Sequence, residues 1–469
     1  MIFKEDDAAA RFRYDPSVFS LLKRIFSRAS RESSVRPRRH FTEPTISIPS
    51  LPRSPSVDGS SATVALPRLP LPYSISERRG AVPDQSRQLA LREVFTPTRP
   101  QRGGRRLTGR EDELMRIFRA LTLDRAHVVL YGERGRGKTS LVNMVASTAR
   151  NSGYMVGRYT CSSESKFDDI IRGLVRDLPA SMLTMSLVED VTLEGCEAAL
   201  PPGRLQPRDV ASLPSRLIGH HLVLIADEFD RVLDGPTRTL FADTIKQTSD
   251  QGAALSFVIV GVSDSLEELL GQHPSIQRNI ASVPLPLLKD GDIEEILVKG
   301  GQQTSIKFSD PVRRAVVRVA WGVPYVAQLL ALHAATEAVL RQSTTVESMD
   351  LDAAFRRTIQ ESDPRVAALY QNVTVGGRDH AMVITLRALA SGEQDQFARF
   401  VVTEHLSERQ EAERRVDPQA WKRLLEARVV RHCPSIGPDT FAFAEPMLQH
   451  YILIRALLEP ALTAHPKDA

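Results

Sequence analysis

The amino-acid sequence predicts an α/β fold in which a parallel sheet with helices on both faces is followed by a helical lid and a C-terminal module. Three observations support this prediction. Apolar strands alternate with amphipathic helices from about residue 105, as in sheets that are covered on both faces. One strand runs directly into a glycine-rich loop and a helix. Beyond residue 363 the pattern changes to helices around a short hairpin.

The 469 residues divide into four expected regions. These are a leader over 1–104, the sheet domain over 105–289, the lid over 290–362 and the C-terminal module over 363–469. The hydrophobic content of 42% is sufficient for several cores. No apolar run is long enough to cross a bilayer, so we expect no membrane insertion. The three cysteines match no metal or redox spacing, which predicts buried thiols in a cytoplasmic protein.

The leader is the most basic part of the chain. Residues 1–106 carry 20 Lys and Arg against 10 Asp and Glu, whereas the remainder is mildly acidic. The leader also holds 12 of the 30 prolines, many beside serines. Such a composition buries too little apolar area to offset chain entropy, so we expect disorder. Residues 17–28 could form an amphipathic helix that docks on a partner, or a nascent helix without a role.

The glycine-rich segment after the strand 127–131 predicts a polyphosphate site. Gly132, Gly137, Lys138 and Thr139 fill the spacing G-x-x-x-x-G-K-[ST] of a phosphate-binding loop, called here the P-loop. Its backbone N–H groups and the following helix N-terminus face the phosphates. Lys138 supplies a cation for the terminal phosphates, and the Thr139 hydroxyl ligates Mg²⁺. The expected nucleotide contacts are Gly132, Glu133, Arg134, Gly135, Arg136, Gly137, Lys138, Thr139 and Ser140.

Two acids follow the predicted strand 221–226. Such a strand delivers carboxylates to the carboxyl edge of a parallel sheet, where the ligands of α/β folds bind. We expect Asp227 to hold Mg²⁺ through water and Glu228 to polarise the attacking water. A further strand is predicted over 154–161. Residues 181–209 show no clear hydrophobic period, so we expect an insertion there, without an assignable role.

The strand 255–262 ends in Ser263 and Asp264. A polar side chain at this point lies between the two phosphate-contacting strands and could orient the water. The same residues could equally form a turn that caps the helix beginning at Asp264. Thr108 is a comparable cap candidate, because its hydroxyl precedes acids in the first turn of a predicted helix.

These motifs together resemble the origin-recognition-like branch of the AAA+ and STAND ATPases over about residues 105–345. The P-loop and the Asp-Glu pair are specific to NTPases, and the other motifs support the branch. The resemblance implies that Arg110 lies near the adenine and that Ser263 senses the γ-phosphate. It also implies that Arg278 is an arginine finger for a neighbouring subunit, and hence a homo-oligomer in the ATP state. An arginine before a strand can also be an ordinary surface residue.

Three helices are predicted for the lid, beginning near residues 292, 311 and 324. The sensor arginine that the family has at the start of the last helix is absent, and Gly-Val-Pro-Tyr stands at 322–325. This segment is similar to the Gly-x-Pro of STAND switches, which implies that Pro324 packs on the adenine. A proline at a helix start is also common for local reasons. Without the sensor cation, slow switching fits better than fast motor work.

The C-terminal pattern is similar to a winged-helix module. Helices are predicted over Arg378–Ala390, Phe397–His405 and Asp417–Glu426, followed by a hairpin around residue 437 and a last helix over Met447–Leu458. Residues 364–469 hold 13 basic and 13 acidic side chains, so the module has no net field for phosphates. A local stripe could still contact DNA, with autoinhibitory or partner docking as the alternative. Its members are Lys422, Arg423, Arg428 and Arg431.

The sequence therefore predicts an ATP-binding and slowly hydrolysing AAA+/STAND-like switch. ATP is favoured over GTP because no Asn-Lys-x-Asp motif follows the sheet domain. DNA is a candidate partner, through the basic leader or the winged-helix-like module. Two other functions are compatible with the sequence: a nucleic-acid-binding regulator that only senses ATP, and a scaffold that recruits partners through its leader.

Overall fold

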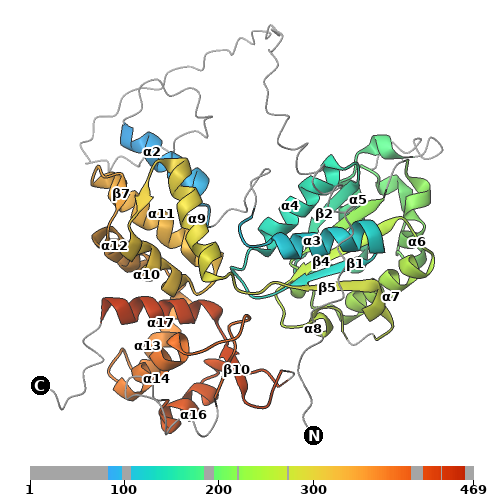
Figure 1. Ribbon diagram of the computed structural model, residues 1–469. Helices are drawn as coiled ribbons and strands as arrows, with labels where there is room; N and C mark the ends of the chain where they lie inside the picture. Colours follow the sequence, from blue (N-terminus) through green and yellow to red (C-terminus); the bar gives the residue numbers. More distant parts are fainter. Residues whose placement is uncertain are drawn as a thin grey trace, which may run out of the picture. The chain divides into compact units, whose positions relative to one another are not determined.

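A parallel sheet, β2-β3-β4-β1-β5, lies at the centre of the sheet domain (Figure 1). This computed structural model describes residues 83–97, 107–183, 195–218, 221–271, 274–402, 416–434 and 436–459. Every described pair of neighbouring strands in this sheet is parallel. The strands are β1 His127–Tyr131, β2 Met155–Thr160, β3 Leu222–Asp227, β4 Leu255–Gly261 and β5 Ile280–Pro284.

Both faces of the sheet are covered, which confirms the predicted α/β fold. Strands β3 and β4 are buried along their whole length, as their apolar sequences predict. One core lies between the sheet and helices α3 Glu111–Arg119 and α4 Lys138–Asn151. The other lies between the sheet and α5 Phe167–Arg176, α6 Pro207–Ala211, α7 Gly235–Asp250 and α8 Leu266–Leu270. Side chains that alternate along each strand supply the two cores, so Val128 faces one and Val129 the other.

Short helical turns join these elements. They are η2 Ala120–Asp124, η3 Ala180–Met182, η5 Glu197–Ala199, η6 Leu213–Arg216, η7 Phe229–Arg231 and η8 Pro274–Asn279. The described part of the segment 181–209 is not a peripheral insertion, because Cys196, Leu200 and Leu205 are buried in the core under α5 and α6. Its cysteine is unpaired, as are Cys161 and Cys433, and all three are buried as predicted.

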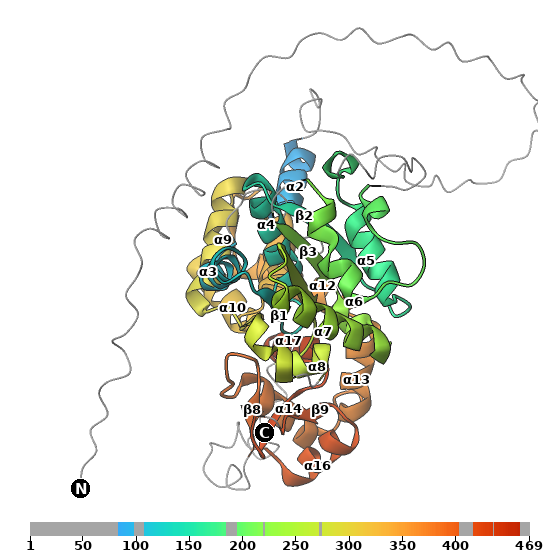
Figure 2. The same ribbon diagram turned by 90° about the vertical axis from the view of Figure 1, so that its right-hand side faces the viewer.

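The lid contains the three predicted helices and a fourth one. They are α9 Asp290–Thr304, α10 Asp310–Ala320, α11 Pro324–Leu340 and α12 Ser348–Gln360. Helix α11 is the central element, because it packs against α9, α10 and α12 at once (Figure 1). Figure 2 shows the same elements from the side. A short parallel pair, β6 Lys307–Phe308 and β7 Thr345–Val346, closes one end of the lid.

One end of the predicted leader is wrong. Residues Pro83–Val94 form helix α2, where the sequence analysis expected disorder through residue 104. Leu91 and Phe95 are buried in the lid core, and Phe95 packs edge-on against Phe308. The sequence did not predict this helix, because its surroundings are rich in proline and its apolar residues are buried only against the folded lid. Residues 1–82 and 98–106 lie outside the described ranges, and so does the candidate helix 17–28.

The C-terminal module has the winged-helix-like arrangement that the sequence predicts. Its helices are α13 Pro364–Thr374, α14 His380–Ser391, α16 Pro418–Glu426 and α17 Pro446–Leu458. Its strands are β8 Phe400–Val401, β9 Val430–His432 and β10 Thr440–Phe443, in the antiparallel order β8-β10-β9. The Asp417 side chain caps α16 by accepting from the backbone N–H of Ala420, which confirms the predicted start of this helix.

Two local predictions are wrong. In the described part of the helix expected over Phe397–His405, residues 397–402 are not helical and include strand β8, in which Phe400 is buried and Val401 is exposed. Residues 403–415 lie outside the described ranges. Thr108 does not cap the first helix of the sheet domain, because the N-cap position is Arg110 and no side chain bonds to it. The first error arises because a short segment adopts the structure that its neighbour completes, here β10.

Helix α17 connects the C-terminal module to the lid. Ile454 is buried in the lid core, and the Val319 carbonyl accepts from His450 Nδ1 at 2.8 Å. Burial lowers the pKa of His450 to about 4, so the ring is neutral at ordinary pH. None of the helices within the described ranges combines the length and the apolar character that spanning a bilayer requires.

Candidate functional site

The P-loop joins β1 to α4, as predicted. Its last glycine, Gly137, has φ +91° and is the N-cap of α4. A side chain at this position would be strained in the left-handed region, so glycine is required. No side chain bonds to this cap. The first turn of a 14-residue helix therefore presents backbone N–H groups without a side-chain acceptor, which is the arrangement that binds phosphate.

Lys138 reaches back across the P-loop. Its Nζ donates to the carbonyls of Gly132 at 2.7 Å and Glu133 at 3.0 Å. Burial lowers the pKa of the ammonium to about 8, and the nearby carboxylates of Glu133, Asp230 and Asp227 partly oppose this shift. The two hydrogen bonds hold the ammonium against the P-loop carbonyls, and the charges of the acids after β3 act on it.

The two acids after β3 have different surroundings. Asp227 is buried; its Oδ1 accepts from the Glu228 N–H at 3.0 Å and its Oδ2 is 2.5 Å from Arg158. The Glu228 side chain is about half exposed and pairs with Arg231 at 2.8 Å. The Glu228 backbone has φ +55°, an uncommon value for a residue with a Cβ. It turns the chain sharply at the edge of the sheet, so the carboxylate projects from that edge.

Ser263 makes bonds within its own turn. Its Oγ lies 2.6 Å from the Ser265 carbonyl and 2.8 Å from Glu268 Oε2. The N-cap of α8 is Ser265, whose hydroxyl accepts from the Glu268 N–H. The Asp264 carboxylate is paired with Arg431 of strand β9. The described geometry thus corresponds to the local-turn alternative, with the N-cap at Ser265, two residues after the predicted Ser263.

Two buried arginines, Arg110 and Arg136, connect the P-loop to other segments by hydrogen bonds to backbone carbonyls. Arg110 donates to the carbonyls of Arg136 at 3.2 Å and Pro286 at 2.8 Å, and pairs with Glu113. Arg136 donates to the carbonyls of Leu285 at 3.1 Å and Phe397 at 2.8 Å. Burial lowers the pKa of Arg136 to about 10, so it remains charged at neutral pH. The Arg136 side chain therefore holds the chain together and is not directed at a phosphate. A direct adenine contact by Arg110 would require its backbone bonds to break.

The start of helix α11 touches the P-loop. The Tyr325 N–H donates to the Gly135 carbonyl at 3.4 Å. A Cβ at Gly135 would lie 3.1 Å from Val323 Cγ1, and one at Gly137 would lie 3.9 Å from Pro324 Cγ. Pro324 is thus brought to the P-loop, as its proposed role near the nucleotide requires.

The remaining predicted residues are more open to solvent. Arg134 and Arg278 are exposed, and Arg278 lies in η8 immediately before β5. Thr139 and Ser140 are half-buried in the first turn of α4. Within the described ranges, no group of three His, Cys, Asp or Glu side chains could hold a metal. A hydroxyl and a single carboxylate, Thr139 and Asp227, are the kind of sparse donor set that suits Mg²⁺ bound largely by phosphates and water.

Sequence reasoning did not place three charged residues at this site, although it named Arg431 as part of a possible DNA-contacting stripe. Arg158 lies in β2 beside Asp227, and Arg431 pairs with Glu133 and Asp264. Asp230 Oδ1 accepts from the Val262 N–H at 2.8 Å and so joins the turn after β3 to the end of β4. A signal was present for Arg158, because a charged residue inside a buried strand requires a partner. For Arg431 the sequence contains no such signal.

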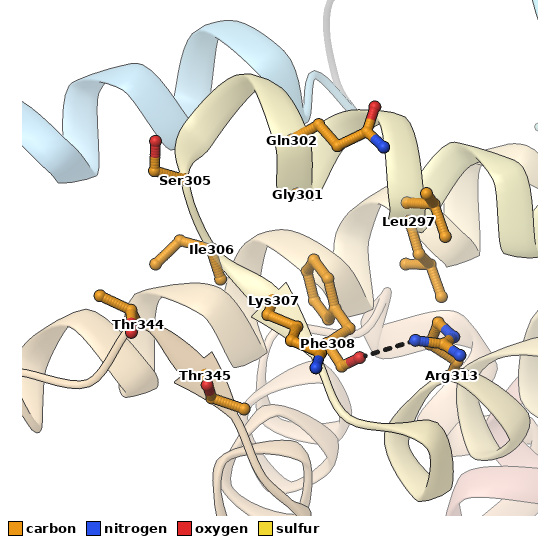
Figure 3. Close-up of a pocket in the computed structure, with 11 residues that line it drawn as sticks. Leu297, Gly301, Gln302, Ser305, Ile306, Lys307, Phe308, Arg313, Thr344 and Thr345 are labelled. Carbon is orange, nitrogen blue, oxygen red and sulfur yellow. Dashed lines mark hydrogen bonds between the residues drawn. The ribbon is translucent and has the colours of Figure 1, made fainter.

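A hollow of about 390 Å³ in the lid is separate from this site (Figure 3). Its walls come from α9, β6, α10 and the segment before β7, and include Leu297 and Phe308. Arg313 lies at its edge and donates to the Phe308 carbonyl at 3.0 Å. No P-loop residue lines the hollow.

Residues 122–270 match the family described as "AAA domain". No curated protein matches the chain. Among solved structures, a Walker-type ATPase of Pyrococcus abyssi is similar with 17% identity and a TM-score of 0.47, over 77% of this chain and 99% of that one. The ORC2 protein of Aeropyrum pernix has 15% identity and a TM-score of 0.45, over 80% and 99%. The RuvB Holliday junction branch migration motor of Thermotoga maritima has 16% identity and a TM-score of 0.38, over 73% of this chain and 94% of that one.

The lowered pKa of Lys138 predicts a pH dependence of nucleotide affinity. Phosphates bind the charged ammonium, and the free protein loses this proton as the pH rises through about 8. ATP affinity should therefore fall about tenfold between pH 7 and pH 9. Lys138→Arg keeps its charge, so its affinity should change little over this range. Calorimetric titrations at pH 7, 8 and 9 measure the pH dependence of ATP affinity in both proteins. An equal pH dependence in the two would contradict the role of Lys138 in phosphate binding.

Proposed function

We propose that this chain, whose residues 122–270 form an AAA domain, is an ATP-dependent switch that couples its nucleotide state to the position of its C-terminal module. One observation carries the proposal. Two charged side chains of the P-loop, Glu133 and Arg136, bind the C-terminal module instead of facing solvent. A nucleotide that reorganises this loop must also act on the module.

The contact through Arg431 spans the candidate site. Its Nη2 is 2.7 Å from Glu133 Oε1 and 3.2 Å from Asp264 Oδ1, and Nη1 also contacts Asp264. Burial lowers the pKa of Arg431, but the bond to Asp264 and the charges of both acids outweigh it and raise the pKa overall. Glu133 belongs to the P-loop and Asp264 to the turn after β4. A relative shift of these two segments would separate the acids that Arg431 holds together.

A second contact lies beside the first. Arg136 donates to the Phe397 carbonyl, and the Leu287 N–H donates to the Gln396 carbonyl at 2.8 Å. The module is also tied to the lid through α17, by His450 and Ile454. We infer that lid and module move as one body, and that their joint with the sheet domain lies at the P-loop and at residues 285–288.

Hydrolysis would use the residues at the carboxyl edge of the sheet. Lys138 would bind the terminal phosphates, Thr139 and Asp227 would hold Mg²⁺, and Glu228 would polarise water after leaving Arg231. When bound, Mg²⁺ neutralises charge on the phosphates. The lid supplies no arginine at its Gly-Val-Pro-Tyr segment, 322–325, which supports slow turnover. A cytoplasmic location remains a prediction.

Direct DNA binding by the C-terminal stripe has less support. Arg423 pairs with Asp379 at 2.6 Å, and Arg431 is held by Glu133 and Asp264. Lys422 is largely exposed. DNA engagement through Arg431 would therefore require the module to leave the P-loop, which makes DNA a candidate for the partner of the released state. The scaffold alternative rests on the leader, outside the described residues.

Substitutions in the P-loop and after β3 test the enzymatic part of the proposal. Lys138→Ala should abolish ATP binding, because it removes the ammonium that meets the terminal phosphates. Glu228→Gln should retain ATP affinity but reduce turnover by about 100-fold or more. Equilibrium binding and phosphate release measure the two effects separately. Parent-like turnover in Glu228→Gln would remove this residue from the mechanism.

The Arg431 contact predicts a coupling that can be measured. Arg431→Ala should speed ADP release about fivefold, since coupling between contacting charges is of order 1 kcal/mol. Its radius of gyration in X-ray scattering should rise with ATP at lower nucleotide concentration than in the parent. Lys422→Ala is the matched control, because its side chain is 79% exposed. The double variant Asp264→Asn/Arg431→Ala should release ADP at nearly the same rate as either single variant.

Arg278 predicts assembly if it completes the nucleotide site of a neighbouring copy. Such head-to-tail contacts build rings or filaments. An equal mixture of Arg278→Ala and Lys138→Ala chains should recover about one quarter of the parent ATPase activity. Random pairing joins an intact P-loop to an intact finger in that fraction of interfaces. Activity equal to the sum of the two separate mutants, with a single monomer peak in sedimentation with Mg-ATP, would exclude the finger.

A further inference from the structure

Strand β2 places an arginine next to the carboxylate that is expected to hold Mg²⁺. In the pairing of β2 with β3, Arg158 is opposite Ile225 and Thr160 is opposite Asp227. Residues two apart on a strand share a face, so Arg158 and Asp227 are diagonal neighbours on one side of the sheet. This side is covered by α4, the helix that begins at the P-loop.

The guanidinium is held between the sheet and that helix. Arg158 Nη2 is 2.5 Å from Asp227 Oδ2, and Nη1 contacts Asn143 Oδ1. Asn143 lies four residues after Thr139 in α4, on the same face of the helix. Arg158 therefore contacts Asp227, one of the two candidate Mg²⁺ ligands. Its second partner, Asn143, lies one helical turn from Thr139, the other candidate ligand.

The charges show why this arginine matters. The Asp227 side chain is only 6% exposed, and a carboxylate buried to that degree requires a cation. Arg158 provides one, although its own Nε is buried without a hydrogen-bond partner in the described structure. Its side chain is 27% exposed, so part of it reaches solvent. An arginine with one unsatisfied donor is easier to displace than one whose donors are all bonded.

We propose that Arg158 is the resident counter-cation of Asp227 and that Mg²⁺ must displace it to bind. Arg158 and Mg²⁺ would repel each other as neighbouring cations, and the water through which Asp227 is expected to hold Mg²⁺ would compete with Arg158 for Oδ2, since Oδ1 already accepts from the Glu228 N–H. The arginine keeps Asp227 paired when Mg²⁺ is absent and sets the Mg²⁺ concentration at which the site fills. This proposal rests on the proposed function only in taking Asp227 as the carboxylate that holds Mg²⁺.

The test compares Arg158→Met with the parent in the full-length chain. Without nucleotide, Arg158→Met should melt at a lower temperature than the parent, because Asp227 is left unpaired, and millimolar Mg²⁺ should restore the loss. The Mg²⁺ concentration that half-saturates binding of a fluorescent ATP analogue should fall about tenfold. The double variant Arg158→Met/Asp227→Asn should show neither response to Mg²⁺.

Two further variants decide the outcome. Asn143→Ala leaves both charges in place but removes the second contact of Arg158, so it should lower the half-saturating Mg²⁺ concentration even if Arg158→Met does not fold. Arg150→Met is the control, because Arg150 is an α4 arginine whose partner is Asp177. It should leave the Mg²⁺ dependence unchanged.

Parent-like Mg²⁺ dependence in Asn143→Ala and in every folded Arg158 variant would overturn the counter-cation role. A parent that binds no ATP at any Mg²⁺ concentration would instead refute the proposed function. The melting response of Arg158→Met to Mg²⁺ alone, measured without nucleotide, would still decide this inference.

Discussion

The structure depends on how the carbonyl groups at the end of β5 are satisfied. The chain leaves the sheet at Pro284 and enters the lid at Asp290, and buried carbonyls in between require donors. Arg136 and Arg110 supply them at Leu285 and Pro286. Because Arg136 belongs to the P-loop, the phosphate-binding loop and the lid connection are parts of one hydrogen-bonded unit. Sheet domain, lid and C-terminal module all meet there.

This arrangement explains why so many cations surround the candidate site without creating a strongly positive pocket. Lys138 is bonded to loop carbonyls, Arg158 to Asp227, and Arg431 to Glu133 and Asp264. Each charge already has a partner that a bound Mg-nucleotide would have to compete for or rearrange. In such a site, binding of a Mg-nucleotide exchanges existing ion pairs for new ones and does not simply fill an empty pocket. This property suits the proposed switch better than a motor.

The sequence predicted the parts of the site that depend on local spacing. The P-loop, the acids after β3 and the strand–helix order follow from neighbouring residues, and the structure has them where they were expected. The predictions failed where a segment depends on a distant surface. Helix α2 has few apolar residues of its own and is completed by the lid core through Leu91 and Phe95. Strand β8 is completed by β10. Ser263 was ambiguous in sequence because one hydroxyl suits a turn and a sensor equally well.

By itself, the sequence determined the sheet, the phosphate-binding loop and the class of ligand, because glycine positions and alternating apolar residues act within a few residues of each other. Only the tertiary structure decided what the charged side chains do. Glu133 and Arg431 are 298 residues apart, and Arg158 and Asp227 are 69 apart. Ion pairing depends on distance in space, and no spacing along the chain encodes which of many arginines will meet which carboxylate once the domains have packed.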